Sequence, residues 1–163
     1  MKTVILGSGK GTNAKAIMEA QSSELLGNTK LVAIFSDKKE AAILETAKRH
    51  KIHNQYLDPG PLNTKFDEKS ELTWIKTIRE YKPDLIVLAG FMRILTSTFL
   101  EAFPGIILNL HPSLLPSFKG LHAIDQAFAH GVKISGCTVH WVNDQLDGGK
   151  IIAQAPVRIM QGD

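Results

Sequence analysis

An amide and an imidazole stand two residues apart at the end of an apolar run, in Ile-Ile-Leu-Asn-Leu-His-Pro (106–112). Side chains two apart on a strand point to the same face, so Asn109 and His111 are expected to lie side by side. Asparagine offers N–H donors, and histidine exchanges a proton near neutral pH. This pair suits the stabilisation of an oxyanion. The spacing alone also allows a structural asparagine beside a core histidine.

Two acids follow in Val-Asn-Asp-Gln-Leu-Asp-Gly-Gly (142–149). Either Asp144 or Asp147 could pair with His111, raise the pKa of the imidazole and fix its orientation. Sequence spacing does not choose between the two acids. A surface turn rich in aspartate, asparagine and glycine is the alternative interpretation.

A glycine-rich loop, Gly-Ser-Gly-Lys-Gly-Thr-Asn (7–13), joins a predicted strand to a predicted helix. Glycines let backbone amides approach an anion at a helix N-terminus, so phosphate is the expected ligand. Gly9, Gly11 and Ala14 match the dinucleotide pattern, and Asp37 ends the second strand, where a ribose-binding acid would stand. The loop alone leaves three interpretations open: a dinucleotide site, a site for another phosphate compound, and a tight turn.

Short apolar runs alternate with helical patterns along the chain. Strands are expected at 4–6, 31–35, 53–56, 85–89, 106–110, 135–142 and 151–157, and helices at 14–26, 41–50, 67–81 and 123–129. The expected buried helix faces comprise Ala14, Ile17, Met18 and Leu25 in one helix and Leu72, Ile75 and Ile78 in another. The alternation predicts a single α/β domain over 1–163, with a doubly wound, mostly parallel sheet and helices on both faces. Ligands of such sheets lie beyond the carboxyl ends of the strands, so the segments after Leu6, Ala89 and Leu108 are expected to line a crevice.

The composition excludes several classes of protein. The 163 residues carry a formal charge of +3 with scattered lysines and arginines, which does not favour nucleic-acid binding but can attract an anionic substrate. No apolar run approaches the roughly 20 residues of a membrane helix, and no signal peptide is expected. Cys137 is the single cysteine and is expected to be a small packed residue. The histidines lack a metal-ligand spacing, so we expect no metal and a cytoplasmic protein.

Four blocks of sequence together resemble the phosphoribosylglycinamide formyltransferases, a family of folate-dependent enzymes. The blocks are Gly-Ser-Gly-Lys-Gly-Thr-Asn (7–13), Ala-Gly-Phe-Met-Arg-Ile-Leu (89–95), Asn-Leu-His-Pro-Ser-Leu-Leu-Pro-Ser-Phe-Lys-Gly (109–120), and Gly-Cys-Thr-Val-His-Trp-Val (136–142) with Leu-Asp-Gly-Gly (146–149). The resemblance spans essentially the whole chain. It implies a Rossmann-like fold and formyl transfer from 10-formyltetrahydrofolate to glycinamide ribonucleotide in purine biosynthesis.

The resemblance also implies roles for particular residues. The catalytic set is Asn109, His111 and Asp147, with His140 and Pro112 in support. Phosphate would bind at Gly11, Thr12 and Asn13, where threonine replaces the serine common in the family. The folate pocket would be lined by Met92, Arg93, Ile94, Leu95, Val142, Asn143 and Asp144. The implied partners are two small molecules, without a metal, nucleic acid or membrane, and the family also allows a homodimer.

Two further expectations come from the resemblance. A cis peptide is expected before Pro116. The family continues beyond the last strand into a helix that packs on the sheet, and this chain stops at Asp163, so we expect that C-terminal helix to be missing. Rival activities are those of methionyl-tRNA formyltransferase, formyltetrahydrofolate hydrolase, an NAD-dependent oxidoreductase and a non-catalytic nucleotide- or folate-binding protein. The segment Ser-Phe-Lys-Gly (117–120) lacks the arginine-rich sequence of the first rival.

Overall fold

The computed structural model describes residues 1–160 and 162, and the chain divides into two compact units, Met1–Ile107 and Leu108–Asp163. The first unit contains β1 (Lys2–Leu6), α1 (Thr12–Ser22), β2 (Lys30–Ser36), α2 (Ala42–Arg49), β3 (Asn54–Tyr56), α3 (Glu68–Glu80), β4 (Leu85–Leu88) and α4 (Ser97–Ala102). Strand β5 (Ile107–His111) begins at its end. The second unit continues with α5 (Ala123–Ala129), β6 (Ile134–Trp141) and β7 (Ile151–Arg158).

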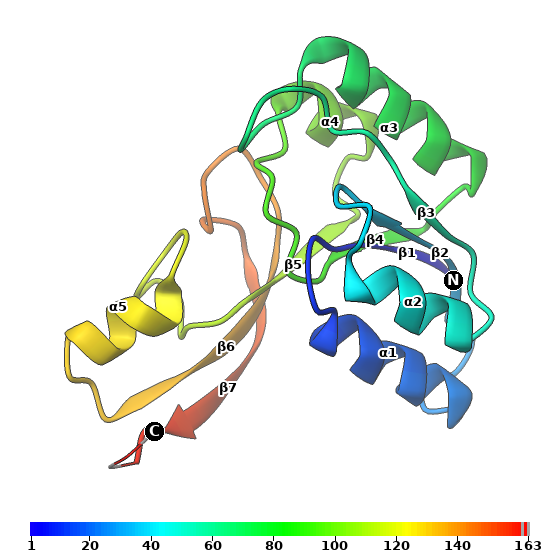
Figure 1. The fold of residues 1–163 in the computed structure, drawn as a ribbon. Coiled ribbons are helices and arrows are strands. Elements are labelled where there is room, and N and C mark those ends of the chain that lie inside the picture. The colour runs from blue at the N-terminus through cyan, green and yellow to red at the C-terminus, as the bar shows by residue number, and fades with distance from the viewer. Residues whose placement is uncertain (161, 163) are drawn as a thin grey trace. The chain divides into compact units, whose positions relative to one another are not determined.

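The strands of the first unit form a parallel sheet. Strand β1 pairs with β2 and β4, and β2 pairs with β3, all in parallel register. Helices α1 and α2 lie on one side of these strands, and α3 and α4 lie on the other (Figure 1). The core residues Val4, Ile5 and Leu6 of β1 are completely buried because both faces of the sheet are covered. The doubly wound arrangement predicted from the sequence is therefore confirmed in this unit.

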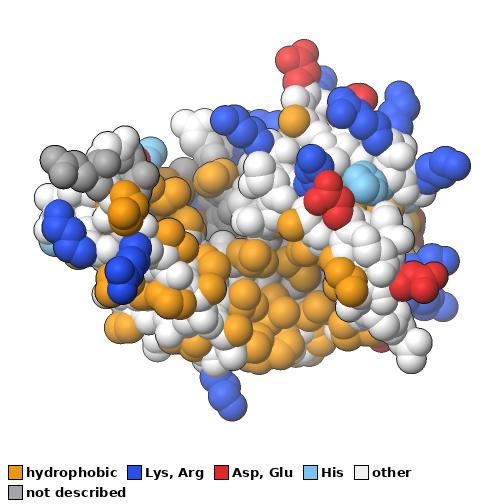
Figure 2. All heavy atoms as spheres, turned by 90° about the horizontal axis from the view of Figure 1, so that it is seen from below, with side chains coloured by type: hydrophobic (Ala, Val, Ile, Leu, Met, Phe, Trp, Pro, Cys, Tyr) orange, Lys and Arg blue, Asp and Glu red, His pale blue; other side chains and the backbone are white. Residues whose placement is uncertain are grey.

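The second unit is built on antiparallel strands. Strand β6 pairs with β5 and with β7, and the complete strand order is β3-β2-β1-β4-β5-β6-β7. The β5–β6 register sets Asn109 opposite His140 and His111 opposite Thr138. Every residue of β7 is exposed. Figure 2 shows one face of the molecule, on which hydrophobic side chains gather. Within the described residues, no helix combines the length and apolarity that a membrane span requires.

Helix α3 shows where periodicity placed a buried face incorrectly. The Asp67 side chain caps the helix by accepting a hydrogen bond from the Ser70 N–H, at 2.8 Å. Trp74, Ile75 and Ile78 are buried, whereas the side chain expected to join them, Leu72, is 52% exposed. The buried face instead includes a charged residue, Glu71, which accepts a hydrogen bond from the Thr96 hydroxyl. A partner supplied by a distant segment thus allowed a carboxylate to occupy the face assigned to an apolar residue.

Helix α1 ends four residues earlier than its apolar pattern indicated. The chain leaves the helical conformation after Ser22, and Glu24 has a φ of 58°. Leu25 is consequently 77% exposed and does not share the buried face of Ala14 and Met18. Helix α4 was not predicted at all, because its six residues provide only one buried apolar side chain, Phe99.

The buried face of α3 can be tested by truncating two aliphatic side chains of similar size. Ile78 is fully buried, so Ile78→Ala should lower the free energy of unfolding by about 2–5 kcal/mol through lost burial and the cavity left behind. Leu72→Ala should cost less than about 1 kcal/mol, because half of the side chain already meets solvent. Urea denaturation followed by circular dichroism measures both values. Equal losses would show that the assigned face is wrong.

Candidate active site

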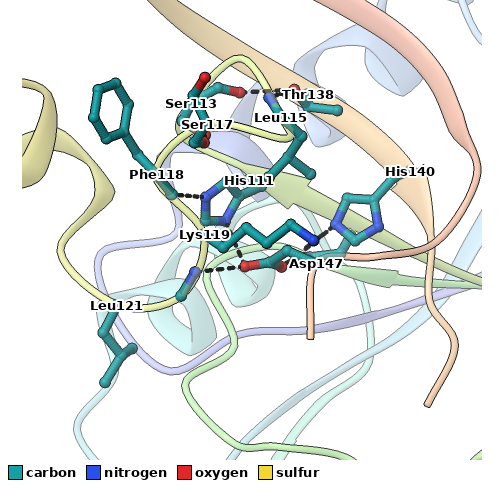
Figure 3. A network of polar contacts seen from close by, with 12 residues as sticks. His111, Ser113, Leu115, Ser117, Phe118, Lys119, Leu121, Thr138, His140 and Asp147 are labelled. Carbon is teal, nitrogen blue, oxygen red and sulfur yellow. Dashed lines mark hydrogen bonds and ion pairs between the residues drawn. The ribbon is translucent and has the colours of Figure 1, made fainter. Parts of the chain in front are cut away.

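The predicted pair on β5 meets a carboxylate that follows β6. The Asn109 amide nitrogen lies 3.4 Å from Asp147 Oδ1, and His111 Nδ1 lies 3.4 Å from Asp147 Oδ2. Figure 3 shows His111 and His140 on either side of the Asp147 carboxylate. The other candidate acid, Asp144, is exposed. The structure therefore brings Asn109, His111 and Asp147 together, all within the second unit.

Both ring nitrogens of His111 face hydrogen-bond acceptors. Nδ1 faces the Asp147 carboxylate, and Nε2 lies 2.8 Å from the backbone carbonyl oxygen of Phe118. Only the protonated imidazolium carries an N–H on each nitrogen, so this environment matches the charged form of the ring. The side chain is 5% exposed, which keeps water from competing for these contacts. Pro112 follows directly and is itself exposed.

His140 links the asparagine to the carboxylate. Its Nδ1 lies 2.9 Å from the backbone carbonyl oxygen of the next residue, Trp141, so Nδ1 donates a hydrogen bond. Its Nε2 lies 3.2 Å from Asn109 Nδ2 and 3.6 Å from Asp147 Oδ1. The Asp147 carboxylate raises the pKa of His140 above its usual value, although burial acts in the opposite direction. A protonated His140 would donate from Nε2 to Asp147, whereas a neutral ring with Nδ1–H accepts from Asn109.

The Asp147 carboxylate is the shared partner of these groups. Burial alone would raise its pKa, but the contact with His140, the Gly120 N–H and the charge of His111 outweigh burial and lower it. The Gly120 N–H donates to Oδ2 at 2.8 Å. Asp147 itself has a φ of 48°, a left-handed conformation that is uncommon for a residue with a Cβ. Aspartate adopts this conformation more readily than most residues with a Cβ, so the turn is compatible with the residue at this position.

A second set of polar contacts holds the segment that supplies the Phe118 carbonyl. The fully buried Thr138 hydroxyl donates to Ser113 O at 2.7 Å and accepts from the Leu115 N–H and from Gln154 Nε2, both at 3.0 Å. The Leu115–Pro116 peptide is cis, as the family resemblance predicted. Sequence reasoning did not single out Thr138. Its position two residues before His140, on the same face of β6, was the available signal.

The predicted phosphate-binding residues lie in the first unit, at the start of α1. Gly11 has a φ of 71°, and a Cβ at this position would clash with Ile43 of α2. A glycine is therefore required there. Thr12 and Asn13 are exposed and form the first turn of the helix. An open N-terminal turn with free backbone N–H groups is compatible with an anion.

The predicted folate-binding residues occupy both units. In the first unit Met92 and Ile94 are exposed and Leu95 is half-buried. In the second unit Val142 is half-buried, and Asn143 and Asp144 are exposed. The backbone N–H of Met92 donates to Ser8 Oγ at 2.8 Å, so the loops after β1 and β4 lie together in the first unit.

The side chain of Arg93 has an internal partner. Arg93 Nε donates to Asp37 Oδ2 at 3.0 Å, and Nη1 donates to the carbonyls of Leu62 and Lys65, each at 2.7 Å. Both charged side chains are almost fully buried. Asp37 is thus engaged in a buried ion pair, which removes the support that it gave to a dinucleotide interpretation of the glycine loop.

Among the residues that the structure describes, no group of three histidine, cysteine or acidic side chains is arranged to hold a metal ion. Cys137 was expected to be packed, and this was wrong, because the thiol is exposed. It alternates along β6 with the buried Thr138 and so points to the opposite, open face of the strand.

The comparisons with known proteins agree over the whole chain. The profile of a family described as formyl transferase matches residues 1–163. The chain is 42% identical to phosphoribosylglycinamide formyltransferase of Escherichia coli (strain K12), covering 100% of this chain and 76% of that protein, and 37% identical to the Bacillus subtilis (strain 168) protein of the same name, covering 99% and 82%. The crystal structure of glycinamide ribonucleotide transformylase 1 from Symbiobacterium toebii superposes with a TM-score of 0.92 at 39% identity, covering 100% of this chain and 76% of that one. This similarity confirms the predicted α/β fold.

The coupling between Asp147 and His140 predicts how stability varies with pH. Because the pKa of His140 is raised in the folded protein, its stabilising contribution to the free energy of unfolding is complete below its unfolded-state pKa, about 6.5. This contribution is lost as pH rises through the folded-state pKa. Because the pKa of Asp147 is lowered in the folded protein, its stabilising contribution to the free energy of unfolding is present above its unfolded-state pKa, about 3.9. This contribution is lost as pH falls through the folded-state pKa. The unfolding free energy of the native chain relative to Asp147→Asn should therefore peak between about pH 4 and 6.5.

The experiment is urea denaturation of both proteins across the pH range. Asp144→Asn, which removes an exposed acid three residues away, is the matched control and should give a difference that hardly varies with pH. A flat difference for Asp147→Asn would contradict the coupling.

Proposed function

Because the chain belongs to the formyl transferase family, we propose that it transfers the formyl group of 10-formyltetrahydrofolate to the amine of glycinamide ribonucleotide. The family membership supports formyl transfer in general. The named relatives support this acceptor, since both are phosphoribosylglycinamide formyltransferases and are 42% and 37% identical to the chain over the aligned residues.

The observation that carries the proposal is the buried cluster of an amide, two imidazoles and one carboxylate. Each carboxylate contact of Asp147 with a polar atom of Asn109, His111 or His140 is 3.6 Å or shorter. The Asn109 amide nitrogen also lies 3.2 Å from His140 Nε2. Acyl transfer to an amine passes through a tetrahedral oxyanion, which preorganised N–H donors and positive charge stabilise. Asn109 and His111 are donors of these two kinds.

In the proposed mechanism the free amine attacks the formyl carbon, and a carbon–nitrogen bond forms while the carbonyl oxygen becomes an oxyanion. Asn109 and protonated His111 hold this oxyanion. To contact the oxyanion, His111 gives up one of its two present hydrogen-bond acceptors. These acceptors are the charged Asp147 carboxylate and the uncharged Phe118 carbonyl. The bond from the formyl carbon to the folate nitrogen then breaks, and a proton passes from the amine to that nitrogen through a water beside Asp147. Holding both substrates in register supplies much of the acceleration.

His140 has a supporting role in this proposal. When its ring is protonated, Nε2 donates to Asp147 instead of accepting from Asn109. An N–H of Asn109 is then free for the oxyanion. The Asp147 carboxylate raises the pKa of His140 above its usual value, which shifts the ring toward this protonated state.

The remaining proposed roles concern binding. Gly11, Thr12 and Asn13 would hold the phosphate of the nucleotide through backbone amides and the threonine hydroxyl, as expected for an open helix N-terminus. Backbone groups of 92–95 and 142–144 would contact the folate. The buried Arg93 guanidinium is committed to Asp37 and two carbonyls, so its part in folate binding would fall to its backbone.

One assay tests the proposed activity. The protein is mixed with 10-formyltetrahydrofolate and glycinamide ribonucleotide, and the deformylated folate is followed by absorbance. We expect turnover that requires the nucleotide. Turnover without it would indicate a hydrolase, and tight binding of both ligands without turnover would indicate a binding protein.

Substitutions test the roles of the cluster. Asn109→Ala should lower kcat by about 10²–10³, the usual effect of losing one oxyanion donor. His111→Ala and Asp147→Ala should also lower kcat, because the first removes the positive charge and the second its orienting partner. Asp125→Ala, which removes an exposed acid of α5 in the same unit, is a control for general effects of removing a carboxylate. A variant of Asn109, His111 or Asp147 with nearly native kcat would remove that residue from its role.

Substitution at the phosphate turn should affect binding rather than chemistry. Thr12→Ala removes the hydroxyl that would contact the phosphate, so it should raise KM for the nucleotide. It should leave kcat nearly unchanged, because the phosphate lies away from the reacting amine and is bound equally in the ground and transition states. Steady-state kinetics with the nucleotide varied separates the two parameters. A loss confined to kcat would contradict the assignment.

A further inference from the structure

The first unit contains a positively charged hollow that the proposed formyl transfer does not use. The hollow has a volume of about 560 Å³ and is formed by two loops. Ser8, Gly9 and Lys10 come from the loop after β1, and residues 38–42 come from the loop after β2 and the first residue of α2. The two loops are joined by the hydrogen bond from Ile43 N–H to Gly9 O, at 3.2 Å, and lie side by side in Figure 1.

The charges around the hollow are unbalanced. Its lining includes the three cations Lys10, Lys38 and Lys39 and the single acid Glu40. None of these lysines takes part in an ion pair within the described residues, and Lys39 only approaches the Tyr56 ring, at 5.5 Å from its centroid. Like charges gathered without counter-charges raise the local positive potential and attract an anion.

The floor of the hollow offers further suitable groups. A Cβ at Gly9 would meet no atom within 4 Å, so the backbone of this residue borders open space. The Ser8 hydroxyl oxygen accepts from the Met92 N–H, which leaves its own O–H proton available to a ligand. Several ammonium groups with a hydroxyl donor and accessible backbone are the groups that bind phosphate oxygens.

We propose that this hollow is a second anion subsite, which binds a phosphate or diphosphate group through Lys10, Lys38 and Lys39 independently of the Gly11–Asn13 turn. Gly11, Thr12 and Asn13 are not part of its lining. The subsite adjoins the turn through Lys10, so the two sites together suit a ligand with more than one anionic group. The proposal concerns binding and does not depend on formyl transfer.

A second hollow in the same unit provides a matched control. It has a volume of about 440 Å³ and is lined by Glu68, Lys69, Leu72, Thr73 and Lys76, all from α3. It also contains two lysines and one acid, but it lacks a glycine loop. Removing its two lysines changes the net charge of the chain by the same amount as removing Lys38 and Lys39.

The test measures binding of inorganic pyrophosphate to the full chain by isothermal titration calorimetry at low salt. Lys38→Gln/Lys39→Gln should weaken binding about tenfold, the combined effect of two exposed charge contacts, and Lys69→Gln/Lys76→Gln should change it less than about twofold. Equal weakening by the two double variants, or no binding by the native chain, would overturn the proposal.

A further variant separates the subsite from the phosphate turn. Thr12→Ala removes the side-chain contact proposed for the turn and should leave the affinity of the lysine-dependent pyrophosphate site within about twofold of the native value, whereas Lys10→Gln should weaken it. A loss with Thr12→Ala as large as that of the lysine variants would place the anion on the turn and refute a separate subsite. Because the readout is binding, it stands apart from the formyl-transfer assay, and failure of either can be recognised without the other.

Discussion

The burial of one carboxylate, Asp147, constrains most of the second unit. A buried charge costs several kcal/mol unless hydrogen bonds and opposite charges surround it. Asp147 meets this requirement with the Gly120 N–H, the Asn109 amide and the two imidazoles of His111 and His140. These groups come from β5, β6 and the loop that follows β5, so one side chain ties three segments together.

The geometry of these segments follows from that requirement. The antiparallel register of β5 and β6 sets Asn109 opposite His140, which brings their side chains within 3.2 Å. Phe118 and Asp147 both adopt left-handed conformations, with φ of 54° and 48°. Such conformations are uncommon for residues with a Cβ, although aspartate adopts them more readily than phenylalanine, and the surroundings determine them here. Here they aim the Phe118 carbonyl at His111 and the Asp147 carboxylate into the cluster.

The first unit follows a different principle, in which charge is either paired internally or left available. Arg93 and Asp37 are buried together and serve the packing of the loops after β2 and β4. Lys10, Lys38 and Lys39 instead remain unpaired around a hollow beside the glycine loop. The loop that opens α1 is therefore flanked by backbone donors on one side and by ammonium groups on the other, both suited to anionic ligands.

The sequence by itself determined the alternation of strands and helices, the glycine-rich loop before the first helix, and the shared face of Asn109 and His111. These features follow from local periodicity and backbone sterics, which short segments carry in full. The choice of Asp147 over Asp144 did not follow from spacing, and the family resemblance was needed to prefer it.

Only the tertiary structure decided the partners of the polar side chains. It paired Asp37 with Arg93, set the Phe118 carbonyl against His111, buried Glu71 beside Thr96 and exposed Leu72. Each of these outcomes depends on which distant segment supplies a donor, an acceptor or an apolar cover. A burial pattern read along one helix or strand contains no information about that segment, so periodicity assigned Leu72 to the core and left the partners of Asp37 and Asp147 open.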